Sequence, residues 1–289
     1  MSISAATVKE LRDKTNAGMM DCKKVLNETN GDIEASIKLL RERGILKAAS
    51  KTDRAATEGI ITSRVADDAK SGILLEINCE TDFVSRNENF QAFVADVADT
   101  VSASKAADLD AALAVQKGDI NVGDFVKAKV VELGENIQFR KYVRFDAAPG
   151  GVVVSYIHMG GKVGVLLEVG TTKEETASKD AFKELIKDLT LHIAAAAPKG
   201  LSRNDIPAEV ADAEKEIYRA RLADSGKPAN IIENILVGQM NKFFAESCFL
   251  EQAFVKDDKV VIKNLVEETG KTLGDTITVT RFVRFGLGD

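Results

Sequence analysis

The fold is decided by two stretches of sequence that repeat each other. Residues 59–76 read GIITSRVADDAKSGILLE, and residues 151–168 read GVVVSYIHMGGKVGVLLE, so the second follows the first at a constant offset of 92 without a gap. Each stretch contains two runs rich in β-branched residues separated by a short turn, which is the pattern of a β-hairpin. Self-similarity of this kind indicates a duplicated structural unit.

The repeat extends beyond the hairpins. The offset of 92 also aligns apolar residues with helical spacing, namely Phe90 with Phe182, Phe93 with Leu185, Val97 with Leu189 and Val101 with Ile193. A second echo, at an offset of 140, pairs GENIQFRKYVRF (134–145) with GDTITVTRFVRF (274–285) and predicts a closing strand in each copy. We therefore expect an α+β fold with two related subdomains, 55–146 and 147–289, each an antiparallel sheet with helices on one face.

The offset grows from 92 to 140 because the second copy contains an insertion. Residues 207–224 are highly charged with helical periodicity, SGKP at 225–228 is a break, and residues 231–244 are helical again. This predicts an antiparallel coiled-coil arm at about 207–247. Its expected seam has Val210, Ile217 and Leu222 facing Ile231, Ile235 and Met240. A solvated decoration and a partner-binding role both remain open for this arm.

The first 54 residues predict a small helical head with its linker. Apolar residues recur at helical spacing in three segments, and Gly44 is expected to end the third helix. Residues 47–58 (KAASKTDRAATE) lack a large apolar side chain, which indicates a linker or an exposed helical connection. The segment 1–54 has 11 Lys and Arg against 8 Asp and Glu, so the head is mildly basic in a chain with a net charge of -6.

Composition bounds the class of protein. With 289 residues, 45% hydrophobic and 29% charged, the chain is long enough for a sizeable core. Its acidic balance gives no reason to expect a nucleic acid or a membrane as partner. Three cysteines without a C-x-x-C pair suggest reduced thiols. No signal-peptide core and no run of about 20 apolar residues is present, so a cytoplasmic location is expected.

Signatures of enzymes are sparse. Gly270-Lys271-Thr272 lacks the glycine that a phosphate-binding loop requires five positions earlier, and no G-x-S-x-G occurs. His192 lies in an apolar helix and is expected to be structural, whereas a functional role stays open for His158. Three carboxylates at even spacing, Glu76, Glu80 and Asp82, could bind a hard cation. No further ligands complete a shell, so neither a metal nor a cofactor is expected.

The stretch EINCETDFVSR (76–86) places two apolar side chains in a polar turn. The repeat aligns Phe83 with Glu175 and Val84 with Thr176. Because a position that accepts Glu in one copy faces solvent in the shared fold, Phe83 is predicted to be exposed. Single exposed apolar residues are common, so exposure alone proves nothing. Together with Val84 and Asp82, however, Phe83 is a plausible contact for a partner.

These motifs resemble a known family. EINCETDFVSR and LRDKTNAGMMDCKKVL (11–26) are similar to the paired signature of bacterial elongation factor Ts. The likeness runs from residue 1 to about 289, through NGDIEASIKLLRERG, SYIHMGGKVGVLL and SGKPANIIENILVGQM. The resemblance implies a ubiquitin-associated-like head, two core subdomains and a coiled-coil arm. It also implies a guanine-nucleotide exchange factor, not an enzyme, that acts on elongation factor Tu in translation elongation.

Functional residues follow from the same resemblance. The family's magnesium-dislocation loop falls on Thr81, Asp82, Phe83 and Val84, its head contact on Leu11, Arg12, Met19 and Met20, and its second-subdomain histidine on His158. Without the resemblance, Met19 and Met20 fit packing inside the head somewhat better than exposure. The implied partner is elongation factor Tu, both GDP-bound and nucleotide-free, without a cofactor and without direct contact with nucleic acid or membrane.

Two other classes of function compete. An RNA- or ribosome-associated translation protein would use the head and RKYVR (140–144) as a basic surface, although the echo TRFVR favours a closing strand with outward charges. A metal hydrolase would use the carboxylates near Asp82. Retention on RNA that depends on salt, or stoichiometric metal in the purified protein, would distinguish these classes from an exchange factor.

Overall fold

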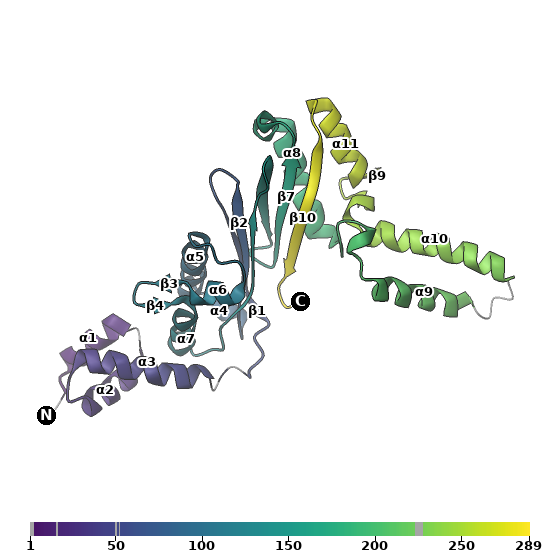
Figure 1. The fold of residues 1–289 in the computed structure, drawn as a ribbon. Coiled ribbons are helices and arrows are strands. Elements are labelled where there is room, and N and C mark those ends of the chain that lie inside the picture. Colours follow the sequence, from purple (N-terminus) through teal and green to yellow (C-terminus); the bar gives the residue numbers. More distant parts are fainter. Residues whose placement is uncertain (1–2, 16, 50, 52, 223–227) are drawn as a thin grey trace.

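Two three-stranded antiparallel sheets form the centre of the protein (Figure 1). The computed structural model describes residues 3–15, 17–49, 51, 53–222 and 228–289. One sheet has the strand order β1-β2-β5 and the other β10-β7-β6. The six strands are β1 (Glu58–Val65), β2 (Ser71–Cys79), β5 (Gln138–Asp146), β6 (Gly151–His158), β7 (Val163–Thr171) and β10 (Ile277–Gly286). The α+β class with antiparallel sheets is confirmed.

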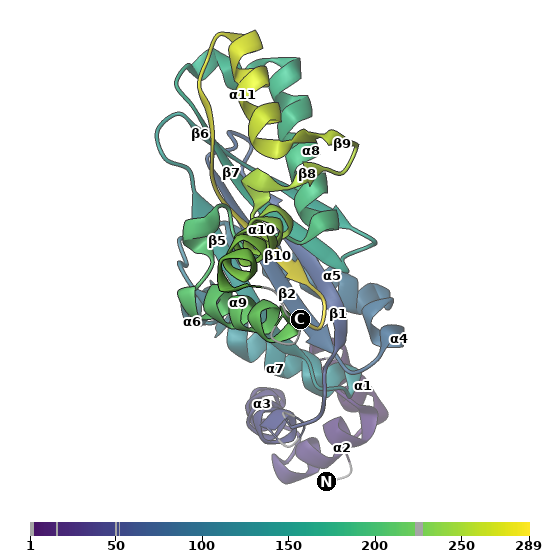
Figure 2. The same ribbon diagram turned by 90° about the vertical axis from the view of Figure 1, so that its right-hand side faces the viewer.

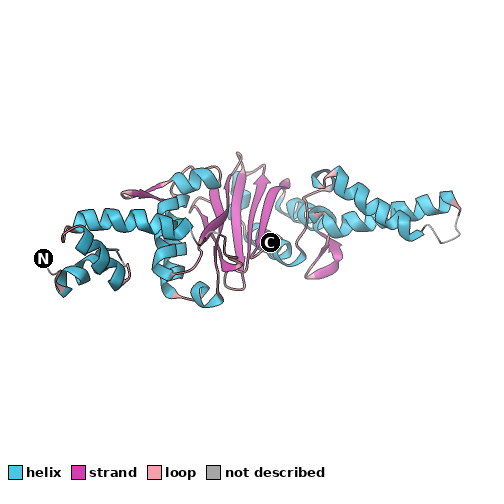
Figure 3. Cartoon of the chain, turned by 90° about the horizontal axis from the view of Figure 1, so that it is seen from below, coloured by secondary structure: helices cyan, strands magenta, loops and turns pink. Residues whose placement is uncertain are grey.

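Helices cover the outer faces of the two sheets, which face each other in the middle of the molecule (Figure 3). The first copy contains α4 (Asp82–Ser85), α5 (Glu88–Ser102), α6 (Leu109–Ala114), β3 (Gln116–Lys117), β4 (Ile120–Asn121) and α7 (Val122–Leu133). The second contains η1 (Glu174–Ser178), α8 (Asp180–Ala196), η2 (Arg203–Asp205), η4 (Phe249–Glu251), β8 (Ala253–Phe254), β9 (Asp257–Val261) and α11 (Ile262–Leu273). The aligned Phe90 and Phe182 are both fully buried, each in the core of its own copy.

The two copies meet across a pseudo-twofold axis. Ser63 donates a hydrogen bond to Ser155, its own equivalent in the repeat, with 2.9 Å between the hydroxyl oxygens. Two backbone hydrogen bonds of 2.8 Å are related by the same symmetry, since Ile61 N donates to Gly161 O and Val153 N donates to Ala69 O. Ile61 is equivalent to Val153 in the repeat, and Ala69 is equivalent to Gly161. We call this contact the pseudo-twofold interface. The buried apolar residues between the sheets include matched pairs, Ile61 with Val153 and Leu74 with Leu166.

Each sheet also repeats a buried ion pair. Glu76 in β2 is fully buried, and its Oε2 lies 3.0 Å from Lys141 Nζ in β5. Its equivalent Glu168 accepts a hydrogen bond of 2.6 Å from Arg281 Nε in β10. A carboxylate this deep requires a cation beside it, because an unpaired buried charge costs several kcal/mol, on the order of 3–5. The occurrence of a carboxylate at both equivalent positions, Glu76 and Glu168, is thus explained by the ion pairs within the two sheets.

The head consists of α1 (Ala5–Thr15), α2 (Met19–Glu28) and α3 (Ile33–Ala49) around a small core that contains Leu11, Cys22 and Leu26. The prediction that Gly44 ends the third helix is wrong, since α3 continues to Ala49. A Cβ at Gly44 would lie 3.3 Å from Val131 Cγ2. The glycine therefore permits close approach of α3 to α7 and does not terminate the helix.

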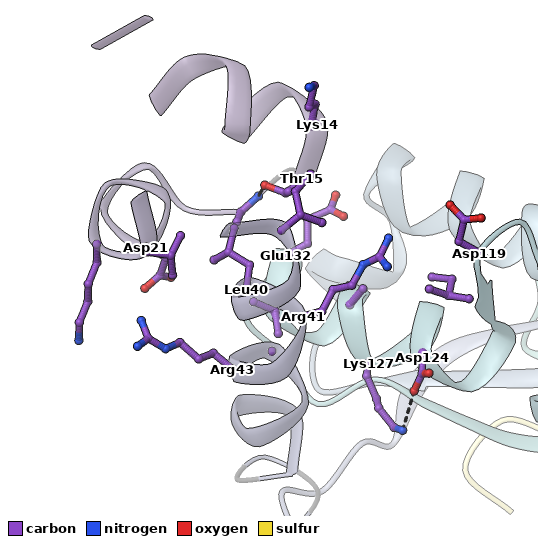
Figure 4. A pocket seen from close by; sticks show the side chains of 18 residues that line it. Lys14, Thr15, Asp21, Leu40, Arg41, Arg43, Asp119, Asp124, Lys127 and Glu132 are labelled. Carbon is purple, nitrogen blue, oxygen red and sulfur yellow. Dashed lines mark hydrogen bonds and ion pairs between the residues drawn. The ribbon is translucent and has the colours of Figure 1, made fainter. Parts of the chain in front are cut away.

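A cavity of about 560 Å³ separates the head from the first copy (Figure 4). Arg41 and Arg43 leave α3 in opposite directions, and Arg43 pairs with Glu28 inside the head. On the far wall, Lys127 Nζ lies 2.8 Å from the carboxylate of Asp124. Charges of both signs line this space, and the cavity does not include the turn that contains Phe83.

The insertion forms two antiparallel helices, α9 (Ala208–Leu222) and α10 (Ala229–Ser247), which extend away from the sheets in Figure 1 and are seen almost end-on in Figure 2. The predicted break at 225–227 lies outside the described residues, and Pro228 caps the start of α10. None of the helices in the described ranges is long and apolar enough to cross a membrane.

The predicted seam of the arm is right in part, since Leu222, Ile235 and Met240 are partly buried and Met240 packs in the arm. Val210, Ile217 and Ile231 are exposed, and the packed positions in α9 include Ala211 and Tyr218. Ala211 and Tyr218 lie one residue after Val210 and Ile217, so the packed face of α9 at these two positions is displaced by one residue from the predicted one. Their packing partners lie toward the base of α10, where Phe243 is buried and Met240 and Phe244 are partly buried.

Candidate functional site

The turn after β2 presents the candidate site. Thr81 caps α4, because its hydroxyl accepts a hydrogen bond of 3.4 Å from Val84 N. Asp82 occupies the first turn of α4, where a negative charge is favoured by the helix dipole, and pairs with Arg86 at 3.0 Å. The hydroxyl of Ser85 donates to Asp82 O at 3.0 Å. These local bonds give a four-residue helix a defined geometry.

Glu135, just before β5, holds this turn against the sheet. Its Oε2 accepts hydrogen bonds from Glu80 N at 3.0 Å and from Thr81 N at 3.1 Å, and its Oε1 accepts one of 2.6 Å from the Thr81 hydroxyl. In the second copy, Asp275 accepts the corresponding bonds from Thr172 and Lys173. Sequence reasoning missed this clamp, although the echo at an offset of 140 aligns Glu135 with Asp275.

Phe83 stands out from this fixed turn. Its side chain is 84% exposed, as the alignment with Glu175 predicted. Val84 differs, since it is partly buried and packs against the core of the first copy, and its equivalent Thr176 is fully buried. The turn therefore anchors itself through Val84 and exposes a phenyl ring one residue earlier.

A second turn lies at the same end of the sheets. The first residue of β1, Glu58, pairs with Cys79 at the end of β2, and the Glu58 carboxylate lies 2.7 Å from Lys162 Nζ. Lys162 follows the turn between β6 and β7, whose Gly161 O accepts the bond from Ile61 N. The end of β1 thus connects the turn of Phe83 with the turn that follows β6.

His158 lies in this second turn. It is exposed, its Nδ1 is 2.9 Å from the Tyr156 hydroxyl, and the two rings stack with 5.7 Å between centroids. The neighbouring Met159 is 71% exposed. Sequence reasoning did not select Met159, although the repeat aligns it with Asp67, a solvent-type residue, just as it aligns Phe83 with Glu175.

The head residues divide into two groups. Met19 and Met20, at the start of α2, are 55% and 76% exposed, so the reading that both pack inside the head is wrong. Arg12 is exposed as well and lines a cleft that also contains Phe93 and Lys129. Leu11 is fully buried in the head core. Its side chain packs inside the head in this structure, and its contact with a partner stays a prediction.

The carboxylates near the turn have separate partners. Glu76 pairs with Lys141 as described, Glu80 lies 3.6 Å from Arg54 Nη1, and Asp82 pairs with Arg86. Within the described ranges, no three His, Cys, Asp or Glu side chains come together in a way that could hold a metal ion. Each of the three carboxylates thus has a basic side chain as its neighbour within the chain.

The remaining candidates have structural roles. His192 is fully buried, with its Nε2 2.9 Å from Gln252 Oε1 and its Nδ1 accepting a bond of 3.2 Å from Val255 N. Burial lowers the pKa of this imidazole, so it stays neutral. Gly270-Lys271-Thr272 lies inside α11, as expected for a segment that is not a phosphate-binding loop.

Comparison with known proteins agrees with these motifs. The family model described as "Elongation factor TS" matches residues 80–289. Proteins named "Elongation factor Ts" from Trichlorobacter lovleyi and Nitratiruptor sp. are 45% and 44% identical, each over 100% of this chain and 94% of the relative. One from Syntrophotalea carbinolica is 46% identical with the same coverage. The chain therefore belongs to the elongation factor Ts family of translation elongation factors.

Proposed function

We propose that this protein is the guanine-nucleotide exchange factor for elongation factor Tu. It binds the GDP-bound GTPase, displaces the magnesium ion and promotes release of GDP, so that GTP can bind. It makes and breaks no covalent bond and is not an enzyme in that sense. The observation that carries the proposal is the phenyl ring of Phe83, 84% exposed on a turn that three hydrogen bonds to Glu135 hold in place.

Exchange is a coupling between two ligands of the same GTPase. The factor and the nucleotide each weaken the binding of the other, so binding of the factor accelerates loss of GDP. In GTPases the phosphates are held by backbone amides, a lysine and magnesium, and loss of the ion removes much of that attraction. Phe83 wedges into an apolar pocket of the partner, while Asp82 perturbs the water around the ion. Thr81 and Val84 hold both side chains in position.

Magnitudes limit what the ring does alone. Burial of one phenyl ring contributes about 2–3 kcal/mol, and each tenfold change requires about 1.4 kcal/mol. One ring therefore supports about two orders of magnitude. The clamp by Glu135 increases the part of this free energy that is available for binding, because a turn that is already ordered loses little conformational freedom when it binds. Further binding energy comes from His158 in the second copy and from Arg12, Met19 and Met20 in the head.

The parts of the chain take separate roles in this proposal. Residues 1–54 form a ubiquitin-associated-like head with its linker, residues 55–146 and 147–289 form the two core subdomains, and residues 207–247 form a coiled-coil arm. The described arrangement supports this division, since α1 to α3 have their own small core and α9 pairs with α10. The exposed methionines of α2 suit a groove on the partner, because flexible thioethers adapt to irregular apolar surfaces.

The proposed setting is the cytoplasm, with elongation factor Tu in its GDP-bound and nucleotide-free forms. No cofactor and no direct contact with nucleic acid or membrane is part of the proposal. The stretch 140–144, which an RNA-associated function would use, is occupied within the protein. Arg140 Nη2 donates to Asp289 O, Lys141 pairs with Glu76, and Arg144 pairs with Asp146 at 2.8 Å.

Release of a fluorescent GDP from elongation factor Tu, followed by stopped flow, tests the proposal. Addition of the protein is expected to accelerate release in a saturable manner, and excess magnesium is expected to oppose the effect. An unchanged release rate at saturating protein would overturn the proposal. Retention of the protein on RNA that weakens with salt, without acceleration of release, would instead support the RNA-associated alternative.

A further inference from the structure

The pseudo-twofold interface makes the two ends of the core directly comparable. At one end lie the turn of Phe83 and the turn of Met159, linked through Glu58 and Lys162. At the other end lie their equivalents, η1 and the turn between β1 and β2. Lys70, the equivalent of Lys162, links this second pair by a different bond, since its Nζ donates to the backbone oxygen of Gly151 at 2.8 Å and not to a carboxylate.

The two ends differ in chemistry at both equivalent positions. Where one end has Phe83 and Met159, the other has the exposed carboxylates Glu175 and Asp67. Of these two pairs of equivalent positions, one end therefore has two apolar side chains, 84% and 71% exposed, and the other has two carboxylates. Because the scaffold is the same at both ends, the packing of the fold does not require apolar residues at either position.

The backbone of Met159 adds an independent observation. Its φ is +49°, in the left-handed region that a residue with a Cβ seldom adopts, and Gly160 and Gly161 follow with φ of +64° and +95°. In the equivalent turn only Ala69, the counterpart of Gly161, has a positive φ. Glycine would adopt the conformation of Met159 without strain. This turn therefore has an exposed apolar side chain at a position where the backbone conformation favours glycine.

Charge indicates what kind of surface this end fits. Lys162 pairs with Glu58, and Asp82 pairs with Arg86, so the charges beside the two apolar side chains are neutralised within the chain. At the opposite end, Asp67 and Glu175 have no ion pair within the described part of the chain. An end with apolar tips and internally paired charges complements an apolar depression on a folded protein better than a polyanion.

We propose that Met159 is a second apolar contact at this end and that it binds the same GTPase as Phe83. This inference rests on the proposed exchange function and adds a residue to it. Contact at two points on one rigid end fixes the orientation in which Phe83 enters the partner. A Cβ on Gly160 would meet no heavy atom within 4 Å, so the tip of the Met159 turn is open to such a partner.

The test uses the full-length chain with Met159→Gly, a substitution that removes the side chain and relieves the backbone. The thermal midpoint is expected to stay equal or rise. The Kd for GDP-bound elongation factor Tu is expected to rise about tenfold, as for loss of a partly buried methionine at an interface. The Met159→Leu variant, which keeps an apolar side chain, is expected to retain most of the wild-type affinity. The Asp67→Gly variant at the opposite end is expected to leave the Kd unchanged.

The outcomes separate the two proposals. If the wild-type protein accelerates GDP release and Met159→Gly matches it in both Kd and release rate, the contact role of Met159 is wrong and the exchange function stands. If Met159→Gly lowers the thermal midpoint and loses affinity only in proportion to unfolded protein, the side chain has a structural role and the contact role is again wrong. If the wild-type protein does not accelerate release, the exchange function fails, and the contact proposed for Met159 falls with it.

Discussion

Glu135 accepts a hydrogen bond of 2.6 Å from the hydroxyl of Thr81, and through it the segment before β5 fixes the turn that exposes Phe83. Glu135→Gln keeps the shape of the side chain and removes its charge, which weakens three bonds at once. We expect the maximal GDP-release rate to fall severalfold, with a stability loss of about 1–3 kcal/mol. Stopped-flow release and urea unfolding measure the two effects.

The second copy supplies the control for this variant. Asp275 makes the equivalent bonds to a turn that lacks an exposed apolar residue. Asp275→Asn is expected to loosen η1 and leave the release rate unchanged. Equal loss of exchange in both variants would mean that general destabilisation, and not the position of Phe83, limits the activity.

Phe83→Ala is expected to reduce the maximal release rate by about two orders of magnitude, since the ring supplies about 2–3 kcal/mol of coupling. Affinity should fall less, because the head and the second copy still bind. Stopped-flow release at saturating protein separates the rate from the affinity. Glu175→Ala, at the equivalent exposed position, is the matched control. A variant that retains the full rate at saturation would remove the wedge from the mechanism.

Met19→Gln combined with Met20→Gln is expected to raise the Kd for the GTPase about tenfold and to leave the maximal release rate within a factor of two. Both side chains are exposed, so the thermal midpoint should not change. Leu11→Ala is the contrasting variant, because its cavity in the head core should cost about 2–5 kcal/mol of stability. Calorimetry and titration of binding check both expectations, and unchanged Kd in the double variant would exclude the head surface.

Cys79 ends β2 directly before the site, and burial, reinforced by the nearby Glu135 charge, raises its pKa from 9.0 to about 12. The folded state therefore retains the thiol proton more strongly than the unfolded state does. The resulting stability is complete below pH 9 and is lost as the pH rises to about 12. Urea unfolding of wild type and Cys79→Ala between pH 8 and 11 should show a smaller decline in the variant. Rapid native alkylation of Cys79 at pH 8 would contradict a protonated, buried thiol.

The sequence predicted the fold best where the chain repeats itself. The repeat at an offset of 92 predicted the hairpins and the long helices, and the echo at 140 predicted the closing strands. The alignment of Phe83 with Glu175 correctly indicated an exposed ring. Periodicity alone was weaker. It predicted Met240 correctly but chose Val210 and Ile217 in α9, one residue before the packed Ala211 and Tyr218, because the buried face depends on contacts with α10 that a local pattern does not contain.

Other features depend on residues far apart in the chain. Gly44 carries the usual signal of a helix end, and only its approach to Val131 explains why α3 continues. The clamp between Glu135 and Thr81 joins residues that the sequence separates by more than 50 positions. The repeat aligns Met159 with Asp67 and so already indicated an exposed side chain, but its left-handed backbone and its place beside the turn of Phe83 are visible only in the structure.

The reciprocal bonds around Ser63 and Ser155 resemble the contact of a symmetric dimer, yet the association of the two halves does not depend on protein concentration. Two separate subunits with such a contact would come apart once their concentration fell below their dissociation constant. Joined in one polypeptide, the halves face each other at an effective concentration on the order of millimolar, whatever the amount of protein in the cell. Covalent linkage thus keeps the dimer-like core assembled, and it leaves each half free to acquire different residues at its own tip.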